Sequence, residues 1–258
     1  MLVFETIAVA FAMFSAIPVP QPAWDQRNMR YALCAFPLVG VVNGLGWWAW
    51  TALCGALQLP VLPQAAGLCL LPVAVTGGIH LDGYADTSDA LASFAPPERR
   101  REILKDPRCG AFAVIRTCAY FVGSFALCGA VMPDSRTLLC MGGAFVLSRA
   151  LSGISIASFP LAKDTGLAHT FAAAADKGRV RRALGAVALL DAGWMCRFGG
   201  IGGGAMVLAA AAVFGYYAYT AKKKFGGLSG DLAGWFLQKA EFWMLAALVL
   251  CQYGEALV

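Results

Sequence analysis

Residues 76–90 hold three aspartates at a spacing that suits chemistry on a phosphate group. Asp82, Asp86 and Asp89 are separated by four and then three positions, so on a helix they share one face. Neighbouring carboxylates repel one another, and Mg²⁺ relieves that repulsion because it takes oxygen ligands from a few carboxylates and from substrate phosphates. The spacing therefore predicts a metal or phosphate site on this segment.

A solvated acidic helix face is the ordinary alternative for such a pattern. Two features favour a site instead. The segment directly follows an apolar run, and the chain has only 15 Asp and Glu among 258 residues. Ionisable groups close to membrane depth are costly and generally functional.

The composition predicts that these aspartates are positioned by membrane helices. Hydrophobic residues make up 59% of the chain and charged residues 14%, against about 25% charged in a soluble domain. We therefore expect an all-α, polytopic transmembrane bundle, with residues 1–258 forming a single integral membrane domain in contact with the lipid bilayer. The net charge of +5 fits basic membrane loops, and no nucleic-acid motif is present. The nine cysteines form no CxxC pair, which disfavours a zinc site.

Six to eight apolar segments are expected to cross the membrane. Residues 2–19 and 183–196 are the two weakest candidates, since the first contains Glu5 and the second is short and contains Asp191. The full set of expected segments is 2–19, 31–57, 63–80, 109–132, 137–159, 183–196, 198–221 and 232–253.

The distribution of basic residues predicts the orientation of the bundle. Most lysines and arginines lie in loops that alternate to one side, which the positive-inside rule makes cytoplasmic. These loops are 21–30, 91–108, 160–182 and 222–224. The Asp82 motif, Arg108, Lys163 and Asp231 are thereby expected together at the cytoplasmic end, where the active site should lie.

Such a collection of acids and bases suits phosphoryl-type transfer, which depends mainly on positioning and charge neutralisation. Arg149 lies well inside an apolar segment, so we expect it to have a phosphate or carboxylate partner. A cation-coupled transporter is an alternative, but it would need its acids near the bilayer midplane rather than at the end of a span.

The residues 76–90 resemble the signature T-G-G-x-H-x-D-G-x-A-D-x-x-D of the cobalamin (5′-phosphate) synthase family, the adenosylcobinamide-GDP ribazoletransferases. Four further elements resemble this family in the same order: Ile17-Pro18-Val19-Pro20, residues 36–40, residues 101–112 and residues 230–234. Two positions depart from the pattern, because Ala90 and Ala113 stand where glycine is usual. The aspartate pattern is also loosely similar to that of the CDP-alcohol phosphotransferases, but Asp86 stands where their arginine would be.

The resemblance implies a Mg²⁺-dependent enzyme of the bacterial cytoplasmic (inner) membrane that acts late in cobalamin biosynthesis. It would join adenosylcobinamide-GDP to α-ribazole or its 5′-phosphate, with GMP as the leaving group. The resemblance leaves open the preferred ribazole form and the choice between a monomer and a homo-oligomer.

Carried over residue by residue, the resemblance implies Asp82, Asp86 and Asp89 as metal ligands. Asp82 and Asp86 would thereby take part in catalysis, together with His80 and Asp231. Asp231 would complete the metal site or act as a base, and His80 would orient a carboxylate, donate to phosphate or make a structural hydrogen bond. Substrate would be bound by Arg108, Arg149, Lys105 and Asp106.

Overall fold

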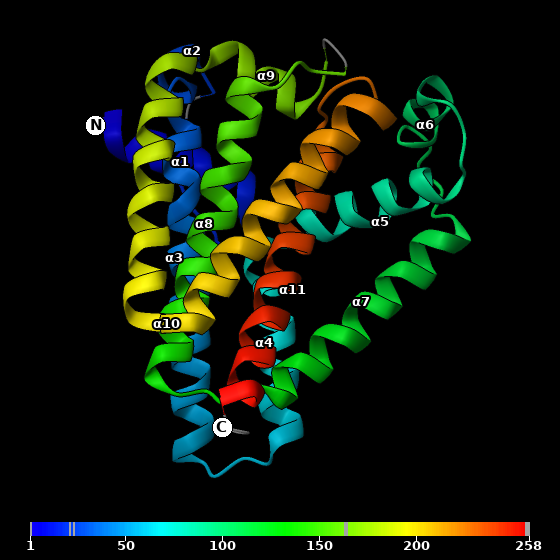
Figure 1. The fold of residues 1–258 in the computed structure, drawn as a ribbon. Coiled ribbons are helices and arrows are strands. Elements are labelled where there is room, and N and C mark those ends of the chain that lie inside the picture. The colour runs from blue at the N-terminus through cyan, green and yellow to red at the C-terminus, as the bar shows by residue number, and fades with distance from the viewer. Residues whose placement is uncertain (1, 21, 23, 163–164, 256–258) are drawn as a thin grey trace.

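The chain folds as a bundle of helices (Figure 1), and this computed structural model describes residues 2–20, 22, 24–162 and 165–255. Within those ranges the only β-type pairing is one isolated bridge between Leu161 and Leu228. The predicted all-α fold is therefore confirmed. Lys163, expected near the site, lies outside the described residues.

Five of the described helices are long and apolar enough to cross a membrane. α8 is the most enclosed of them, and it packs against α3, α10 and α11. The five helices are α3 (Ala32–Ala56), α7 (Ala111–Ala130), α8 (Ser135–Ser158), α10 (Lys177–Lys224) and α11 (Gly230–Glu255). A sixth span results if α4 (Val61–Thr76) and α5 (Ile79–Ala92) are counted as one bent pair.

The two weakest expected segments differ in outcome. The first forms only α1 (Leu2–Phe14), whose 13 residues extend about 20 Å and so fall short of the roughly 30 Å hydrocarbon layer. The second is the first arm of α10, which doubles back on itself in Figure 1. Gly200, with φ +57° and ψ −134°, breaks the helical geometry between the two arms. Counting the arms separately adds one crossing to the five or six.

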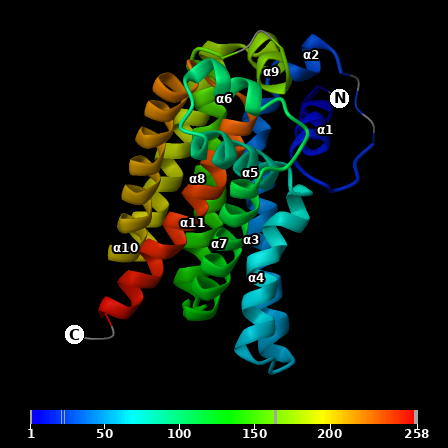
Figure 2. The ribbon, with the colours of Figure 1, turned by 90° about the vertical axis from the view of Figure 1, so that its right-hand side faces the viewer.

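The basic segments gather at one end of the bundle. Figures 1 and 2 place α2 (Gln26–Met29), α6 (Pro97–Ile103) and α9 (Leu167–Ala174) at this end, together with both ends of α10. The α3–α4 and α7–α8 turns lie at the opposite end. We call the first of these the basic end.

The chain turns by 96° between α4 and α5, and this turn directs the aspartate segment across the bundle. Gly77 and Gly78 both have positive φ, at +66° and +81°, a conformation that residues with a Cβ rarely adopt. Earlier in α4, Pro72 has no backbone N–H and cannot donate to the Leu68 carbonyl in the preceding turn. The Trp47 indole nitrogen of α3 donates to this carbonyl instead, at 2.9 Å.

Candidate active site

α5 and α11 cross at backbone contact, and this crossing brings Asp231 to the aspartate segment. A Cβ added at Gly83 of α5 would lie 2.7 Å from the Asp231 carbonyl oxygen. A Cβ added at Gly234 of α11 would lie 2.8 Å from the His80 carbonyl oxygen. Because neither glycine has a side chain, the first turns of the two helices fit against each other.

Two cavities flank α5, and Asp82 lines both of them. The α5–α11 cavity measures about 390 Å³ and extends to α8 and α9; its polar lining includes His80, Asp82 and Asp231. The α5–α7 cavity measures about 640 Å³ and is lined mainly by apolar side chains. The Asp82 carboxylate is thus accessible from both sides of α5.

Asp86 lies one helical turn beyond Asp82 and is half-buried. The charges of Asp82, Asp231 and Asp89 all act on its carboxylate. Four acids therefore share one region, which is the arrangement that a cation would stabilise. Within the described ranges, however, no group of three or more His, Cys, Asp or Glu side chains is close enough to hold a metal ion.

Asp89 stands on the same face but contacts a different element. Its Oδ1 accepts a hydrogen bond from the Ala113 backbone nitrogen at 3.2 Å, at the start of α7. Gly110 precedes α7, and a Cβ there would overlap the Asp89 carboxylate. A carboxylate at a helix N-terminus satisfies unpaired N–H groups and interacts favourably with the helix dipole. As placed, Asp89 orients α7 relative to α5.

His80 lies in the first turn of α5, is 5% exposed and lines the α5–α11 cavity. Its ring centroid is 5.7 Å from that of Phe36. The Nε2 atom is buried and has no hydrogen-bond partner among the described residues. The structure therefore places His80 in the same cavity lining as Asp82 and Asp231, with a buried Nε2 that is unpaired among the described residues.

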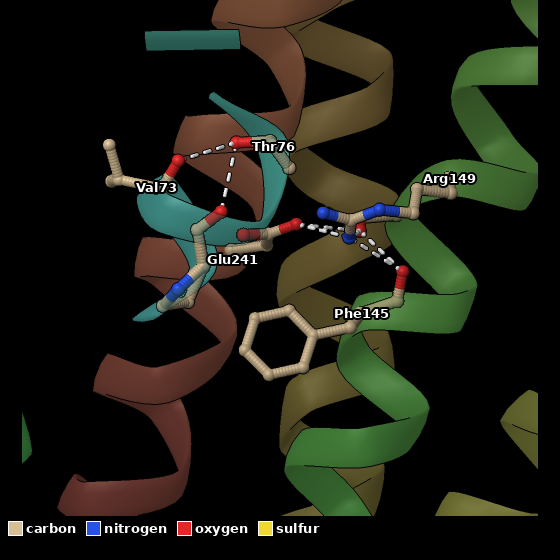
Figure 3. Close-up of polar contacts among 7 residues, drawn as sticks. Val73, Thr76, Phe145, Arg149 and Glu241 are labelled. Carbon is tan, nitrogen blue, oxygen red and sulfur yellow. Dashed lines mark hydrogen bonds and ion pairs between the residues drawn. The ribbon is translucent and has the colours of Figure 1, made fainter. Parts of the chain in front are cut away.

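Arg149 is 1% exposed and forms a buried ion pair with Glu241 of α11, at 2.7 Å between Nη1 and Oε1 (Figure 3). The same Nη1 donates to the Phe145 carbonyl at 2.8 Å, and the Ser148 hydroxyl donates to Glu241 at 3.1 Å. Arg149 does not line either of the two cavities beside α5. The sequence predicted either a phosphate or a carboxylate as the partner of Arg149, and the structure shows the carboxylate of Glu241.

The predicted substrate-binding loop lies at the protein surface beyond α6. Arg108 is 87% exposed and pairs with Asp106, with Nε at 2.9 Å from Oδ1 and Nη2 at 2.7 Å from Oδ2. The Arg108 hydrogen bonds lower the pKa of Asp106 to about 2. Lys105 is also exposed, and Lys105, Asp106 and Arg108 do not line either cavity.

Two other arginines of the basic end have a structural role. Arg101 donates to the Phe225 carbonyl at 2.9 Å and Arg100 to the Lys224 carbonyl at 3.3 Å. Cations at a helix C-terminus satisfy its last carbonyls and interact favourably with its dipole. These arginines of α6 thus hold the end of α10 in place.

Three residues of this region received no role from the sequence. Glu241 was visible only as a charge near the start of an apolar segment, and its partner is 92 positions away. Ser152 and His169 line the α5–α11 cavity. A serine in an apolar helix and a single loop histidine carry no distinguishing sequence signal.

Comparison with known proteins gives matches over nearly the whole chain. The family model of cobalamin-5-phosphate synthase (CobS) matches residues 6–249. An adenosylcobinamide-GDP ribazoletransferase of Lachnoclostridium phytofermentans is 39% identical over 248 residues, covering 96% of this chain and 94% of that protein. A protein of the same name from Pseudomonas fluorescens is 32% identical and covers 94% of this chain and 98% of its own length. No solved structure gives a significant match. The chain therefore belongs to the cobalamin-5-phosphate synthase family.

Proposed function

We propose that this chain joins adenosylcobinamide-GDP to α-ribazole or its 5′-phosphate, forming adenosylcobalamin or its 5′-phosphate and GMP. Its family membership supports this reaction, and the crossing that brings Asp231 to Asp82 and Asp86 beside a cavity is the structural observation that carries it. In this reaction the 3′ hydroxyl of the ribose attacks the phosphorus bonded to cobinamide. The bond from that phosphorus to the GMP oxygen breaks, and GMP leaves.

Asp231 is the residue that we assign as proton acceptor. It lines the α5–α11 cavity at the start of α11, where this helix crosses α5. A carboxylate there can take the proton of the attacking hydroxyl. His80, which lines the same cavity, is assigned to orient the acceptor or a carboxylate.

The acid cluster also supports Mg²⁺ as the cofactor, with Asp82 and Asp86 as its protein ligands. Mg²⁺ commonly binds through one or two carboxylates and the phosphates of the substrate, which agrees with the small number of protein ligands that this site offers. A bound Mg²⁺ would neutralise charge on the diphosphate of the donor. Asp89 could join as a third ligand only by giving up its hydrogen bond to α7.

Arg108, with Lys105 and Asp106 beside it, is proposed to bind phosphate oxygens of the donor from the loop before α7. Arg108 is exposed and carries a planar set of donors that suits phosphate, and it would exchange Asp106 for the substrate. Arg149 is proposed to act through its pair with Glu241 rather than by direct contact with substrate. The basic end, which contains this loop, is proposed to face the cytoplasm of a bacterial inner membrane.

The test is GMP release by the purified, detergent-solubilised protein given adenosylcobinamide-GDP and α-ribazole, with and without Mg²⁺. We expect GMP only when both substrates and the metal are present. Asp82→Asn and Asp86→Asn should each lower the rate by about a thousandfold, since metal-assisted charge stabilisation is worth several kcal/mol. The exposed Glu102→Gln serves as the control and should keep full activity. Full activity in both aspartate variants would contradict the assigned site.

A further inference from the structure

The α5–α11 cavity is large enough for only one of the two substrates. Its volume of about 390 Å³ lies at the lower end of the range for sites that hold drug-sized molecules, roughly 300–1,000 Å³. A corrin ring carrying an adenosyl group and GDP is far larger than such a molecule. A nucleoside made of one bicyclic base and one ribose has the appropriate size.

One wall of this cavity is aromatic. Phe14, Phe36 and Phe171 all line it, with ring centroids 4.2 Å apart for Phe14 and Phe36 and 5.3 Å apart for Phe14 and Phe171. These rings come from α1, α3 and α9, so three separate elements meet to build the wall. A flat aromatic base is well accommodated against such a surface.

The cavity also has buried polar groups that lack partners. The Ser152 hydroxyl on α8 is 1% exposed, and neither its oxygen nor the Nε2 atom of His80 has a hydrogen-bond partner among the described residues. Leaving such groups unpaired is costly, by about 1–3 kcal/mol each. A ligand whose hydroxyl groups bonded both atoms would remove that cost.

We propose that the α5–α11 cavity is the binding site of the acceptor nucleoside, with its base against the phenylalanine wall and its ribose at Ser152, His80 and Asp231. This inference rests on the proposed function, because it assigns one of the two substrates to one side of Asp82. It adds Ser152 and Phe171 as binding residues for the acceptor.

When no metal ion is bound, the charges of the cavity favour α-ribazole over the guanosine diphosphate of the donor. Asp82 and Asp231 place two carboxylates on its lining, whereas the described lining residues include no lysine or arginine. Without a bound metal ion, a diphosphate at this position would meet like charges, and no cation is present among the described lining residues. The base and ribose carry no charge, so α-ribazole without its 5′-phosphate meets no such repulsion.

The first test is the KM of Ser152→Ala for each substrate. We expect the KM for α-ribazole to rise about tenfold, as for the loss of one hydrogen bond, while the KM for adenosylcobinamide-GDP changes less than twofold. Ser155→Ala is the matched control, because Ser155 is also buried on α8 but bonds Tyr217 outside the cavity. An unchanged KM for α-ribazole in Ser152→Ala would overturn the proposal.

The second test is direct binding of α-ribazole to Phe171→Leu, measured by equilibrium dialysis without the donor. Weaker binding of α-ribazole with unchanged binding of GMP is expected. Weaker binding of GMP alone would instead place the nucleotide of the donor in the cavity. If the wild-type protein neither binds α-ribazole nor releases GMP in the activity assay, the proposed function itself is refuted. If the wild type is active and the variants bind α-ribazole as tightly as it does, only this inference is refuted.

Discussion

Asp82, Asp86 and Asp89 occupy equivalent positions on one helix face, yet their surroundings differ. Asp82 lines two cavities, Asp86 is half-buried among other carboxylates, and Asp89 accepts a hydrogen bond from the start of α7. The spacing of four and three correctly predicts their shared face. It carries no information on which neighbouring helix each side chain meets, because that depends on packing between distant segments.

The buried pair of Arg149 and Glu241 should be structural. Removing one partner leaves an uncompensated buried charge, so Arg149→Ala should lower the free energy of unfolding by about 3–5 kcal/mol. The double variant Arg149→Met, Glu241→Leu should recover most of this loss, since well-packed apolar replacements of a buried pair are often tolerated. Thermal unfolding in detergent measures both effects.

The same variants distinguish a structural role of Arg149 from direct contact between Arg149 and substrate. If Arg149 bound phosphate, the double variant would be stable but would lose affinity for adenosylcobinamide-GDP. The position of Arg149 inside an apolar segment predicts a buried partner of opposite charge. The identity of that partner could not be predicted, because Glu241 is 92 positions away on another helix.

The α5–α11 crossing is the element-scale feature on which the site depends. Gly83→Ala and Gly234→Ala should each push the two helices apart, because the added Cβ would lie within 3.0 Å of backbone atoms. Since misplacement of reacting groups by about 1 Å can cost a hundredfold in rate, we expect GMP release to fall by about that factor. Gly193→Ala on α10 is the control: a Cβ added there would meet no atom within 4 Å, so this variant should keep its activity.

The sequence predicted the membrane helices better than the turns that interrupt them. The apolar runs 31–57, 109–132, 137–159 and 232–253 correspond to α3, α7, α8 and α11, because length and apolar composition are sufficient signals for membrane helices. The expected span 63–80 instead ends at Thr76, and the chain turns at Gly77 and Gly78. A pair of glycines permits such a turn but does not fix its angle, which is set by the packing of α5 on α11 and α7.

At the scale of the whole molecule, the basic end should face the cytoplasm. In a variant without its native cysteines, Gln58→Cys in the α3–α4 turn should react with a membrane-impermeant maleimide in intact cells. Arg99→Cys on α6 should react only after permeabilisation, because lysine- and arginine-rich loops are retained inside. The opposite labelling pattern would place the site on the outer face and contradict a substrate supply from the cytoplasm.

The isolated bridge between Leu161 and Leu228 joins two points that are distant in sequence. Backbone hydrogen bonds of 2.8 Å link Ala162 to Leu228 and Leu228 to Pro160, and both bridged leucines line the α5–α11 cavity. The intervening chain, which holds α9 and both arms of α10, therefore begins and ends at one place on the cavity wall, and α9 lines the cavity as well. The bridge closes this segment into a loop. Insertions or deletions at the Gly200 turn can therefore leave the positions of Leu161 and Leu228 relative to each other unchanged.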